Sequence, residues 1–551
     1  MNGLKIISLG GNGRVTQNMY VYQYEEEILL VDCGIGFPDI QMPGVDILIP
    51  DISYVLDQLE QGKKIVGMIL SHGHDDHIAA TAHILPHLPN FPIYGSPLTA
   101  GFAEDRMREG GSKHAVTVIP DTRKFTVGIF TVSLIPVTHS VPDTRHIVIR
   151  TPIGVVYHGS DFKLDPTPVD GQVTDLAAIK NIGDEGVLCM TIDCLRVERS
   201  ERTTSEKTVG PAIEKIMAET KGKSVVTLMS SHIHRIQQTI DAANKHGRKV
   251  TFIGRSVERN IAEAMRLRKI HFPEGVLIDK NDMDQYPDSK LCVIVAGSQG
   301  QEGSSMMRAI YGEHRMVKIT DDDTVIFSAD AIPGNELNYF GAIDELSRNG
   351  VHVLYPDIVP GLHQSGHASM TEQRELLKLV RPKYVMPIGG ADRHRYKFFE
   401  FVAEPLGYAK DKVLLPTTGD VLEFSGNTVR VSERIELKPP IIDGLGIGDV
   451  GPVVLADRIA LSKAGMVVIV LVRNRGKFDL SQTMVVTRGF IFVRDAKEVV
   501  EFIRQEVATL ILREKKTKDE GLKRMIEKRL ARKLYKIIQR EPLIVPVILD
   551  R

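Results

Sequence analysis

Short apolar, β-branched runs bounded by Gly, Pro and Asp dominate the first two hundred residues. This pattern predicts strands at 4–9, 28–33, 64–70, 130–138, 146–150 and 154–158. Helical periodicity is sparse over the same stretch. We therefore expect residues 1–207 to form stacked antiparallel or mixed sheets with some flanking helices.

The pattern of apolar and polar positions changes at about residue 208. Strand-like runs at 224–229, 249–253, 291–296, 324–327 and 351–354 alternate with helical patterns at 234–246, 257–268 and 335–348. Such alternation indicates a parallel, doubly wound sheet. We therefore expect a second α/β domain at 208–370, inserted into the first domain, which resumes at 371–430.

The remaining chain predicts a proline-bearing linker at 431–449 and a small domain at 450–551. Strands are expected at 466–472, 484–493 and 543–549, and Asp495, with Glu498 three residues on, is expected to cap a helix. A second, basic helix carries one apolar stripe made of Leu522, Met525, Ile526, Leu530, Leu534 and Ile537. We expect this domain to pack or dimerise rather than to catalyse.

Composition and charge refine this picture only slightly. The 551 residues are 42% hydrophobic and 25% charged, which is typical of a soluble globular protein. We expect no signal peptide, no membrane segment and, with four scattered cysteines, a cytoplasmic location. The net charge is −1, but residues 513–540 hold 12 Lys/Arg against 4 Asp/Glu. That face either contacts phosphates or is merely solvated, and from charge alone solvation is the better interpretation.

Metal-binding residue types gather where the predicted strand 64–70 ends. The run His-Gly-His-Asp-Asp-His at 72–77 supplies His72, His74, Asp76 and His77. His72 and His74 are two apart, so an extended backbone directs both side chains to the same face. Imidazole nitrogens and carboxylate oxygens together suit zinc or manganese at ~2.0–2.2 Å. The pattern predicts one ion at His72 and His74, and a neighbour at Asp76 and His77, ~3.5–4 Å away.

Three further candidates end other predicted strands. His139 follows the run 130–138, and Asp161 follows 154–158. Alone, His139 equally caps a strand and Asp161 equally belongs to a turn, but both make chemical sense as the next ligands, with Asp161 bridging the ions. Asp32, which ends another strand, is placed to fix the tautomer of a ligand histidine.

These residues together resemble the metallo-β-lactamase superfamily. The segments 9–13, 42–51, 161–163, 296–300, 332–336, 365–369 and 442–451 resemble ribonuclease J, and the resemblance covers nearly the entire chain. It implies an α/β fold, namely a metallo-β-lactamase αββα sandwich with an inserted doubly wound β-CASP domain and a small α+β C-terminal domain. It also implies two Zn²⁺ or Mn²⁺ ions and a 5′-to-3′ exoribonuclease, often with endonuclease activity, that acts on single-stranded 5′-monophosphorylated RNA in RNA maturation and decay.

The resemblance also assigns roles to individual positions. It makes Asp76 and His367 the catalytic candidates, with His367 as a proton donor to the leaving oxygen. It places the RNA backbone and its 5′ phosphate at the residues His363, Gln364, Ser365, Gly366, His367 and Ser328, and at the glycine-rich segment 297–300. Without the resemblance, a helix-capping loop with incidental histidines is the less favoured interpretation of 363–367, and 297–300 is merely a glycine-rich loop. His232 and His234 are as readily core or cap residues as RNA contacts.

Other implied features are weaker in the sequence. Asp193 matches an acidic position of the family, but its surroundings are altered. Asp46, the carbonyl of Leu48, and Asp443 match positions that hold a structural Ca²⁺ in some members. Because family members form dimers and tetramers, the resemblance also implies a homodimer or homotetramer.

One position departs from the family pattern. The family has a last metal histidine in Pro-x-His-Gly-Glu, whereas this chain has Gly389 at the histidine and Ala391 at the glutamate. Three interpretations follow: water replaces the missing ligand, Asp392 or His394 moves into its place, or the second metal site is weak and turnover is reduced.

We expect a nuclease with a weakened second site. Two alternatives stay open: an RNA-binding or scaffolding paralogue whose catalysis is weakened by Gly389, and a small-ester hydrolase of the same fold. The intact run 72–77 argues against full decay of the site. The inserted α/β domain argues against a small substrate, which needs no such clamp.

Overall fold

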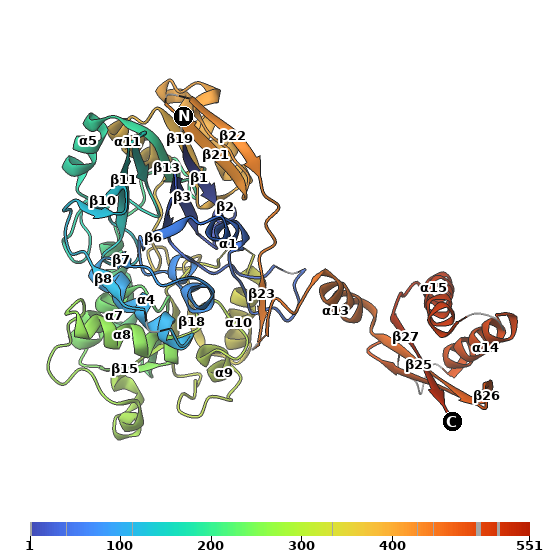
Figure 1. Ribbon diagram of the computed structural model, residues 1–551. Helices are drawn as coiled ribbons and strands as arrows, with labels where there is room; N and C mark the ends of the chain where they lie inside the picture. The colour runs from blue at the N-terminus through green and yellow to red at the C-terminus, as the bar shows by residue number, and fades with distance from the viewer. Residues whose placement is uncertain are drawn as a thin grey trace. The chain divides into compact units, whose positions relative to one another are not determined.

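The computed structural model describes residues 3–39, 41–112, 114–332, 334–426, 428–444, 446–491, 497–514 and 518–551. The chain divides into two compact units, residues 1–37 with 48–440 and residues 38–47 with 441–551. The first unit contains three large sheets, and the second contains its own small sheet (Figure 1). No helix within the described residues is both long enough and apolar enough to cross a bilayer.

Two mixed sheets pack face to face in the first unit. Alternate residues such as Leu29 and Val31 of one sheet and Val132 and Ile149 of the other meet in a shared, fully buried core. The first sheet has the order β22 (Thr428–Arg434), β21 (Asp420–Ser425), β1 (Leu4–Ser8), β3 (Tyr20–Tyr24), β4 (Glu27–Val31), β6 (Lys64–Ile69), β7 (Ile93–Gly95) and β8 (Val116–Val118). The second has the order β19 (Tyr384–Ile388), β13 (Val187–Asp193), β12 (Gly154–His158), β11 (Arg145–Thr151), β10 (Phe130–Pro136) and β9 (Phe125–Val127).

Helices cover the outer faces of this sandwich. On the second sheet, α5 (Leu176–Glu185) and α11 (Met370–Val380) bury Ile179 and Leu376 against Met190 and Val385. Along the first sheet lie α1 (Ser53–Glu60), beside β6, and α4 (Pro97–Glu109), beside β7 and β8. The layers are therefore helix, sheet, sheet and helix, which confirms the expected αββα sandwich.

The inserted domain contains a wholly parallel sheet. Its order is β15 (Lys249–Ile253), β16 (Leu291–Val295), β14 (Ser224–Thr227), β17 (Thr324–Phe327) and β18 (His352–Leu354). The connecting helices are α6 (Val209–Glu219), α7 (Ile233–Lys245), α8 (Arg255–Arg266), α9 (Ser305–Ile310) and α10 (Glu336–Arg348). The doubly wound prediction is confirmed, because buried β-branched strands alternate with amphipathic helices as the sequence pattern indicates.

After the insertion, the chain returns to both sheets of the sandwich. β19 pairs in parallel with β13, so that Cys189 lies opposite Tyr384. β21 pairs antiparallel with β1, so that Leu4 lies opposite Phe424. The sandwich is therefore assembled from two chain segments that flank the insertion.

The second unit has a three-stranded sheet covered by two helices. The order is β26 (Lys477–Arg488), β25 (Met466–Asn474) and β27 (Leu543–Asp550), and α14 (Lys497–Arg513) and α15 (Asp519–Ile538) contribute to its core. A further helix, α13 (Pro452–Ala464), was not expected from the sequence. The expected cap at Asp495 lies outside the described residues, and the expected linker 431–449 includes the end of β22 and the short strands β23 (Ile441–Asp443) and β24 (Gly446–Ile447).

One predicted stripe in this unit was partly wrong. On α15, Leu522, Ile526, Leu530 and Leu534 are buried, but Ile537 is 59% exposed. The buried residues recur every four positions, and Leu534 is the last of them that is fully buried. The next residue at that spacing is Ile538, which is partly buried against the same core, so Ile537 falls on the solvent side.

Candidate metal centre

The cluster 72–77 follows the carboxyl end of β6. Extended backbone leads to His74, which precedes the short helix α2 (Asp75–Ile78). His72 and His77 are buried, and the acidic residues Asp75 and Asp76 occupy the first turn of α2, where a helix favours negative charge. The local fold thus holds imidazoles and a carboxylate at one strand end.

Three imidazoles converge on one point. His72 Nε2 and His139 Nε2 each lie 3.1 Å from His74 Nδ1. In a tetrahedral zinc site with bonds of ~2.0–2.1 Å, neighbouring ligand atoms are about 3.3 Å apart. Burial lowers the pKa of His74 to about 3 and lowers the pKa of His72 and His139 well below the ordinary value, so the rings are neutral. Neutral rings with facing nitrogen lone pairs fit a divalent cation.

Asp161 lies at the middle of the cluster. Its Oδ2 is 3.8 Å from His72 Nε2, 3.6 Å from His77 Nε2 and 3.7 Å from His139 Nε2. Burial opposes ionisation of this carboxyl, but His77 and His367 outweigh it and hold the pKa of Asp161 well below its usual range. A carboxylate that faces imidazoles from both predicted sub-sites has the geometry of a bridging ligand.

The second sub-site is formed by Asp76, His77 and Asp161. His77 Nε2 lies 3.8 Å from Asp76 Oδ2, and Asn18 Nδ2 lies 3.1 Å from the same nitrogen. On the far side of the ring, His77 Nδ1 donates to Asp32 Oδ2 at 2.7 Å. Asp32 is itself held by the backbone amide and hydroxyl of Ser71, each at 2.7 Å. Asp32 therefore fixes the tautomer that directs the Nε2 lone pair of His77 into the site.

Gly389 borders this sub-site without contributing a ligand. Its backbone has φ +67°, and a Cβ there would lie 3.6 Å from Asp193 Oδ1 and 3.8 Å from Asp161 Oδ1. A side chain at 389 would thus point at the centre. His394 Nδ1 instead accepts from the backbone amide of its own helix start at 3.2 Å, and Asp392 pairs with Arg395 at 3.1 Å. Both candidate replacements are engaged elsewhere.

The loop 365–367 packs directly on the metal cluster. His139 Nδ1 donates to the carbonyl of Gly366 at 2.7 Å, which leaves His139 Nε2 free to face the site. A Cβ on Gly366 would lie 2.9 Å from both His139 Cε1 and Ser140 Cβ. Only glycine permits so close an approach, so this residue sets the distance between the inserted domain's loop and the ligands.

His367, from the same loop, contacts two carboxylates. Its Nδ1 donates to Asp193 Oδ2 at 2.8 Å, and its Nε2 lies 4.0 Å from Asp161 Oδ2. Asp193, which ends β13, also accepts from the backbone amide of Leu195 at 2.8 Å. Burial alone would lower the pKa of His367, but Asp193 and Asp161 raise it to about 9. Asp161, Asp193 and His367 also lie close enough together to share an ion.

A fully buried arginine, which the sequence did not single out, holds this loop in place. Arg235 on α7 donates to both carboxylate oxygens of Glu206 at 2.8 Å. It also donates to the carbonyl of Ser328 at 2.7 Å, to His363 Nδ1 at 2.8 Å and to the carbonyl of Gln364 at 3.0 Å. In the sequence, nothing distinguishes Arg235 from any other cation on a helix. Only the tertiary structure shows that it binds this loop.

Several expected RNA contacts have partners inside the protein. The hydroxyl of Ser328 donates to the carbonyl of Leu362 at 2.6 Å, and the hydroxyl of Ser365 accepts from the His367 amide at 3.2 Å. His232 faces Glu206 at 3.4 Å, and His234 faces Asp170 at 3.2 Å. The roles of these residues in RNA binding stay predictions.

The expected calcium positions are also engaged. In the second unit, Asp46 Oδ2 accepts from the Gly444 amide at 2.8 Å, and Asp443 forms an ion pair with Arg458. In the first unit, the carbonyl of Leu48 accepts from the Gly36 amide at 2.8 Å. The role of these residues in calcium binding stays a prediction.

Comparisons with known proteins cover nearly the whole chain. Residues 12–175 match the metallo-β-lactamase superfamily, 221–346 the ribonuclease J β-CASP domain, and 453–551 the ribonuclease J C-terminal domain. Ribonuclease J 1 of Streptococcus pyogenes is 34% identical over 100% of this chain and 98% of its own length. Ribonuclease J of Thermus thermophilus is 35% identical over 99% and 95%, and ribonuclease J2 of Bacillus subtilis is 32% identical over 99% and 98%.

The solved structures add a fold-level match. A protein of unknown function from Enterococcus faecalis superposes with a TM-score of 0.54 at 14% identity, over 77% of this chain and 100% of its own. At this identity the likeness speaks to the fold alone.

Proposed function

Because this chain belongs to the ribonuclease J family, we propose that it is a metal-dependent 5′-to-3′ exoribonuclease with endonuclease activity. Its substrate is single-stranded RNA with a 5′ monophosphate, and its role is RNA maturation and decay in the cytoplasm. The observation that carries the proposal is the convergence of His72, His74, His139 and Asp161 beneath the loop that the inserted domain contributes.

The donor set supports two Zn²⁺ or Mn²⁺ ions. His72, His74, His139 and Asp161 would hold the first, and Asp76, His77 and Asp161 the second. When bound, such ions lower the pKa of an attacking water and neutralise phosphodiester oxygens. Because Gly389 supplies no ligand, we propose that the second ion is held by one protein ligand fewer than the first and dissociates more readily.

The protein's own residues supply positioning and a proton. Asp193 accepts from His367 Nδ1 and, with Asp161, favours the imidazolium form, in which Nε2 also carries a proton and faces the cluster. We assign that proton to the leaving oxygen of the cleaved phosphodiester. Arg235 and Gly366 hold the loop that carries His367. The distance between this proton donor and the candidate metal ligands is therefore fixed.

The assay is degradation of a 5′-labelled, 5′-monophosphorylated single-stranded RNA in the presence of Mn²⁺ or Zn²⁺. We expect the wild type to release mononucleotides, His74→Ala to be inactive, and the exposed control His87→Ala to match the wild type. A 5′-triphosphate on the same RNA should suppress mononucleotide release but not internal cleavage. Equal rates in the wild type and His74→Ala would indicate a contaminating nuclease. No metal-dependent decay by the wild type would favour the RNA-binding paralogue instead.

The oligomeric state is part of the proposal. We propose a homodimer or homotetramer, in line with the family's assemblies. Sedimentation of the full chain tests this directly, and a monomer at every protein concentration would contradict it.

A further inference from the structure

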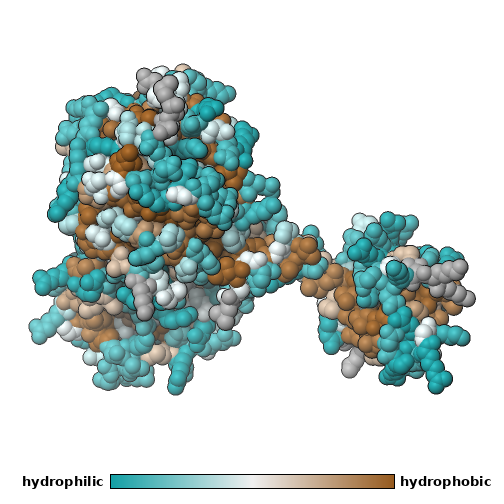
Figure 2. Space-filling model, in the orientation of Figure 1, coloured by the Kyte–Doolittle hydropathy of each residue, from teal (hydrophilic) through white to brown (hydrophobic). Residues whose placement is uncertain are grey.

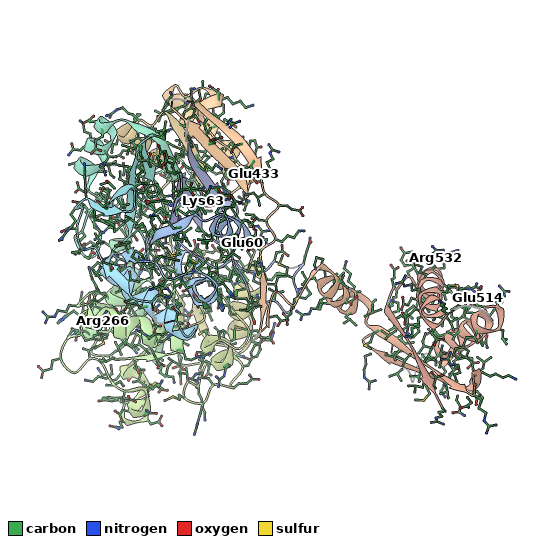
Figure 3. The ribbon with its side chains drawn as sticks, viewed as in Figure 1. Glu60, Lys63, Arg266, Glu433, Glu514 and Arg532 are labelled. Carbon is green, nitrogen blue, oxygen red and sulfur yellow. The ribbon has the colours of Figure 1, made fainter. Side chains whose placement is uncertain are left out.

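The outer side of α15 carries a row of cations that is inclined to the helix axis. Arg524, Lys528, Arg532 and Lys536 recur every four residues and are all exposed. Four helical residues rise about 6 Å, so the row spans about 18 Å. Figure 2 shows hydrophilic side chains over this part of the second unit, and Figure 3 labels Arg532 there. We call these four residues the basic ridge.

The cations of the ridge are unpaired, unlike their neighbours. Lys523 pairs with Glu520, and Arg529 and Lys533 both pair with Glu506. Among the residues that the structure describes, no ion pair involves any member of the ridge. Their charge is therefore available to a ligand rather than spent within the protein.

The opposite face of α15 excludes one class of partner. A helix that binds a membrane surface inserts its apolar face into the lipid. Four apolar residues of α15 are buried in the core of the second unit at 0–2% exposure, and a single aliphatic side chain of the helix, Ile537, is exposed; the buried four are Leu522, Ile526, Leu530 and Leu534. The ridge thus offers positive charge without an apolar face to insert, which favours a water-soluble polyanion.

The distribution of charge along the chain agrees with such a partner. Residues 441–551 hold 22 Lys/Arg and 14 Asp/Glu, a net charge of +8, although the whole chain has −1. Residues 1–440, which contain the metal centre, therefore carry −9 before any ion binds. An acidic catalytic unit attracts RNA poorly from a distance, so a separate basic element would raise the local concentration of the substrate.

We propose that the basic ridge is a second binding site for single-stranded RNA, outside the catalytic unit. Cations about 6 Å apart follow the successive phosphates of an extended strand, each lying within reach of a long side chain. Tyr535, 57% exposed on the same face, offers a ring on which a base can stack. The inference deepens the proposed function, since it concerns how the same substrate is captured.

The size of the effect follows from counter-ion release. Each phosphate contact on a single strand contributes about −0.7 to the slope of log affinity against log salt concentration. Removing four contacts should therefore reduce the magnitude of the slope by about 3. This readout reports charge contacts and does not depend on hydrolysis.

The experiment uses the full chain with His74→Ala, which prevents cleavage, and a fluorescent oligouridylate. The ridge variant combines Arg524→Gln, Lys528→Gln, Arg532→Gln and Lys536→Gln. The control variant removes four exposed cations from other elements of the same unit: Lys463→Gln, Arg475→Gln, Lys477→Gln and Arg488→Gln. Binding is followed by fluorescence anisotropy over a series of salt concentrations, after circular dichroism has shown that both variants are folded.

We expect the ridge variant to bind more weakly and to lose about 3 from the slope, while the control changes by less than about 1. Equal losses in the two variants would overturn the proposal, since they would reflect net charge alone. Unchanged RNA binding by the ridge variant would overturn it as well. Because binding is measured in an inactive variant, absence of nuclease activity in the wild type would sink the proposed function without deciding this one.

Discussion

Replacing Gly389 by histidine tests the structural basis of the weakened second ion. A side chain at 389 fits, because its Cβ would lie at ordinary van der Waals distances, 3.6 and 3.8 Å, from the carboxylates of Asp193 and Asp161. The cost is conformational, since φ is +67° and a residue with a Cβ is strained there by about 1–2 kcal/mol. Metal-free Gly389→His should therefore be less stable than the wild type by about that amount.

Gly389→His is expected to increase the affinity of the protein for the second ion. Even hydrogen-bond partners of metal ligands are worth about 10–100-fold in affinity. A direct imidazole ligand should therefore tighten the second ion by at least about 10-fold, which corresponds to about 1.4 kcal/mol. The wild type should bind its second ion more weakly than its first, and the variant should narrow this difference.

The matched control is Gly389→Ala, which carries the same backbone strain but no ligand. Calorimetric titration of chelator-treated protein with Zn²⁺ gives the affinities for the first and second ions. Urea unfolding of the metal-free protein gives the loss of unfolding free energy that the backbone strain causes. Alanine should reproduce the lost stability but not the gained affinity. If the histidine and alanine variants bind the second ion equally, position 389 does not face that ion and the assigned site is wrong.

Three further predictions follow from the site and the cores. Asp193→Asn removes the carboxylate that keeps His367 protonated and oriented. It should lower the single-turnover cleavage rate by about 10²–10⁴-fold with RNA affinity nearly unchanged, and a loss confined to affinity would contradict the positioning role. Glu206→Gln should cost about 3–5 kcal/mol in urea unfolding at neutral pH, because it leaves the Arg235 charge buried without a counter-ion. Arg235 and His232 outweigh burial and hold the Glu206 pKa well below its ordinary 4.5. The stability that the Glu206 carboxylate contributes should therefore be present above pH 4.5 and be lost only in stronger acid. If Glu206→Gln loses the same unfolding free energy at every pH, the ion pair is not the cause. Leu530→Ala should destabilise the second unit by about 2–5 kcal/mol, whereas the exposed Ile537→Ala should change it by less than about 0.5 kcal/mol, and equal effects in thermal melts would refute the assigned core.

Much of the fold was predictable because local pattern and tertiary structure agree. The strands 154–158, 249–253 and 324–327 begin and end where their β-branched runs do. Helix α13 was not predictable in this way, since none of its residues is buried and no apolar stripe marks it. Periodicity reveals a helix only when one face packs against something.

The candidate site likewise has a part that the local sequence predicts and a part that it does not. The candidate ligands at 72–77 were predictable because four donors lie within six consecutive residues. The contact between Asp193 and His367 joins residues 174 positions apart, and Arg235 reaches its loop partners across more than 90 positions. Such pairings depend on strand order and loop placement, which local patterns do not encode.

The split construction of the sandwich has a consequence for biosynthesis. A nascent chain grows from its amino end, and domains generally fold as units. The inserted parallel sheet has all five of its strands by residue 354, whereas β1 and β13 must wait for β21 and β19, which lie beyond residue 383. The insertion can therefore fold on the ribosome while its host sandwich still lacks strands. His367 and the turn at Gly389 follow all of the candidate metal ligands in the chain, so the candidate site is complete only after residue 389 of the 551 has been made.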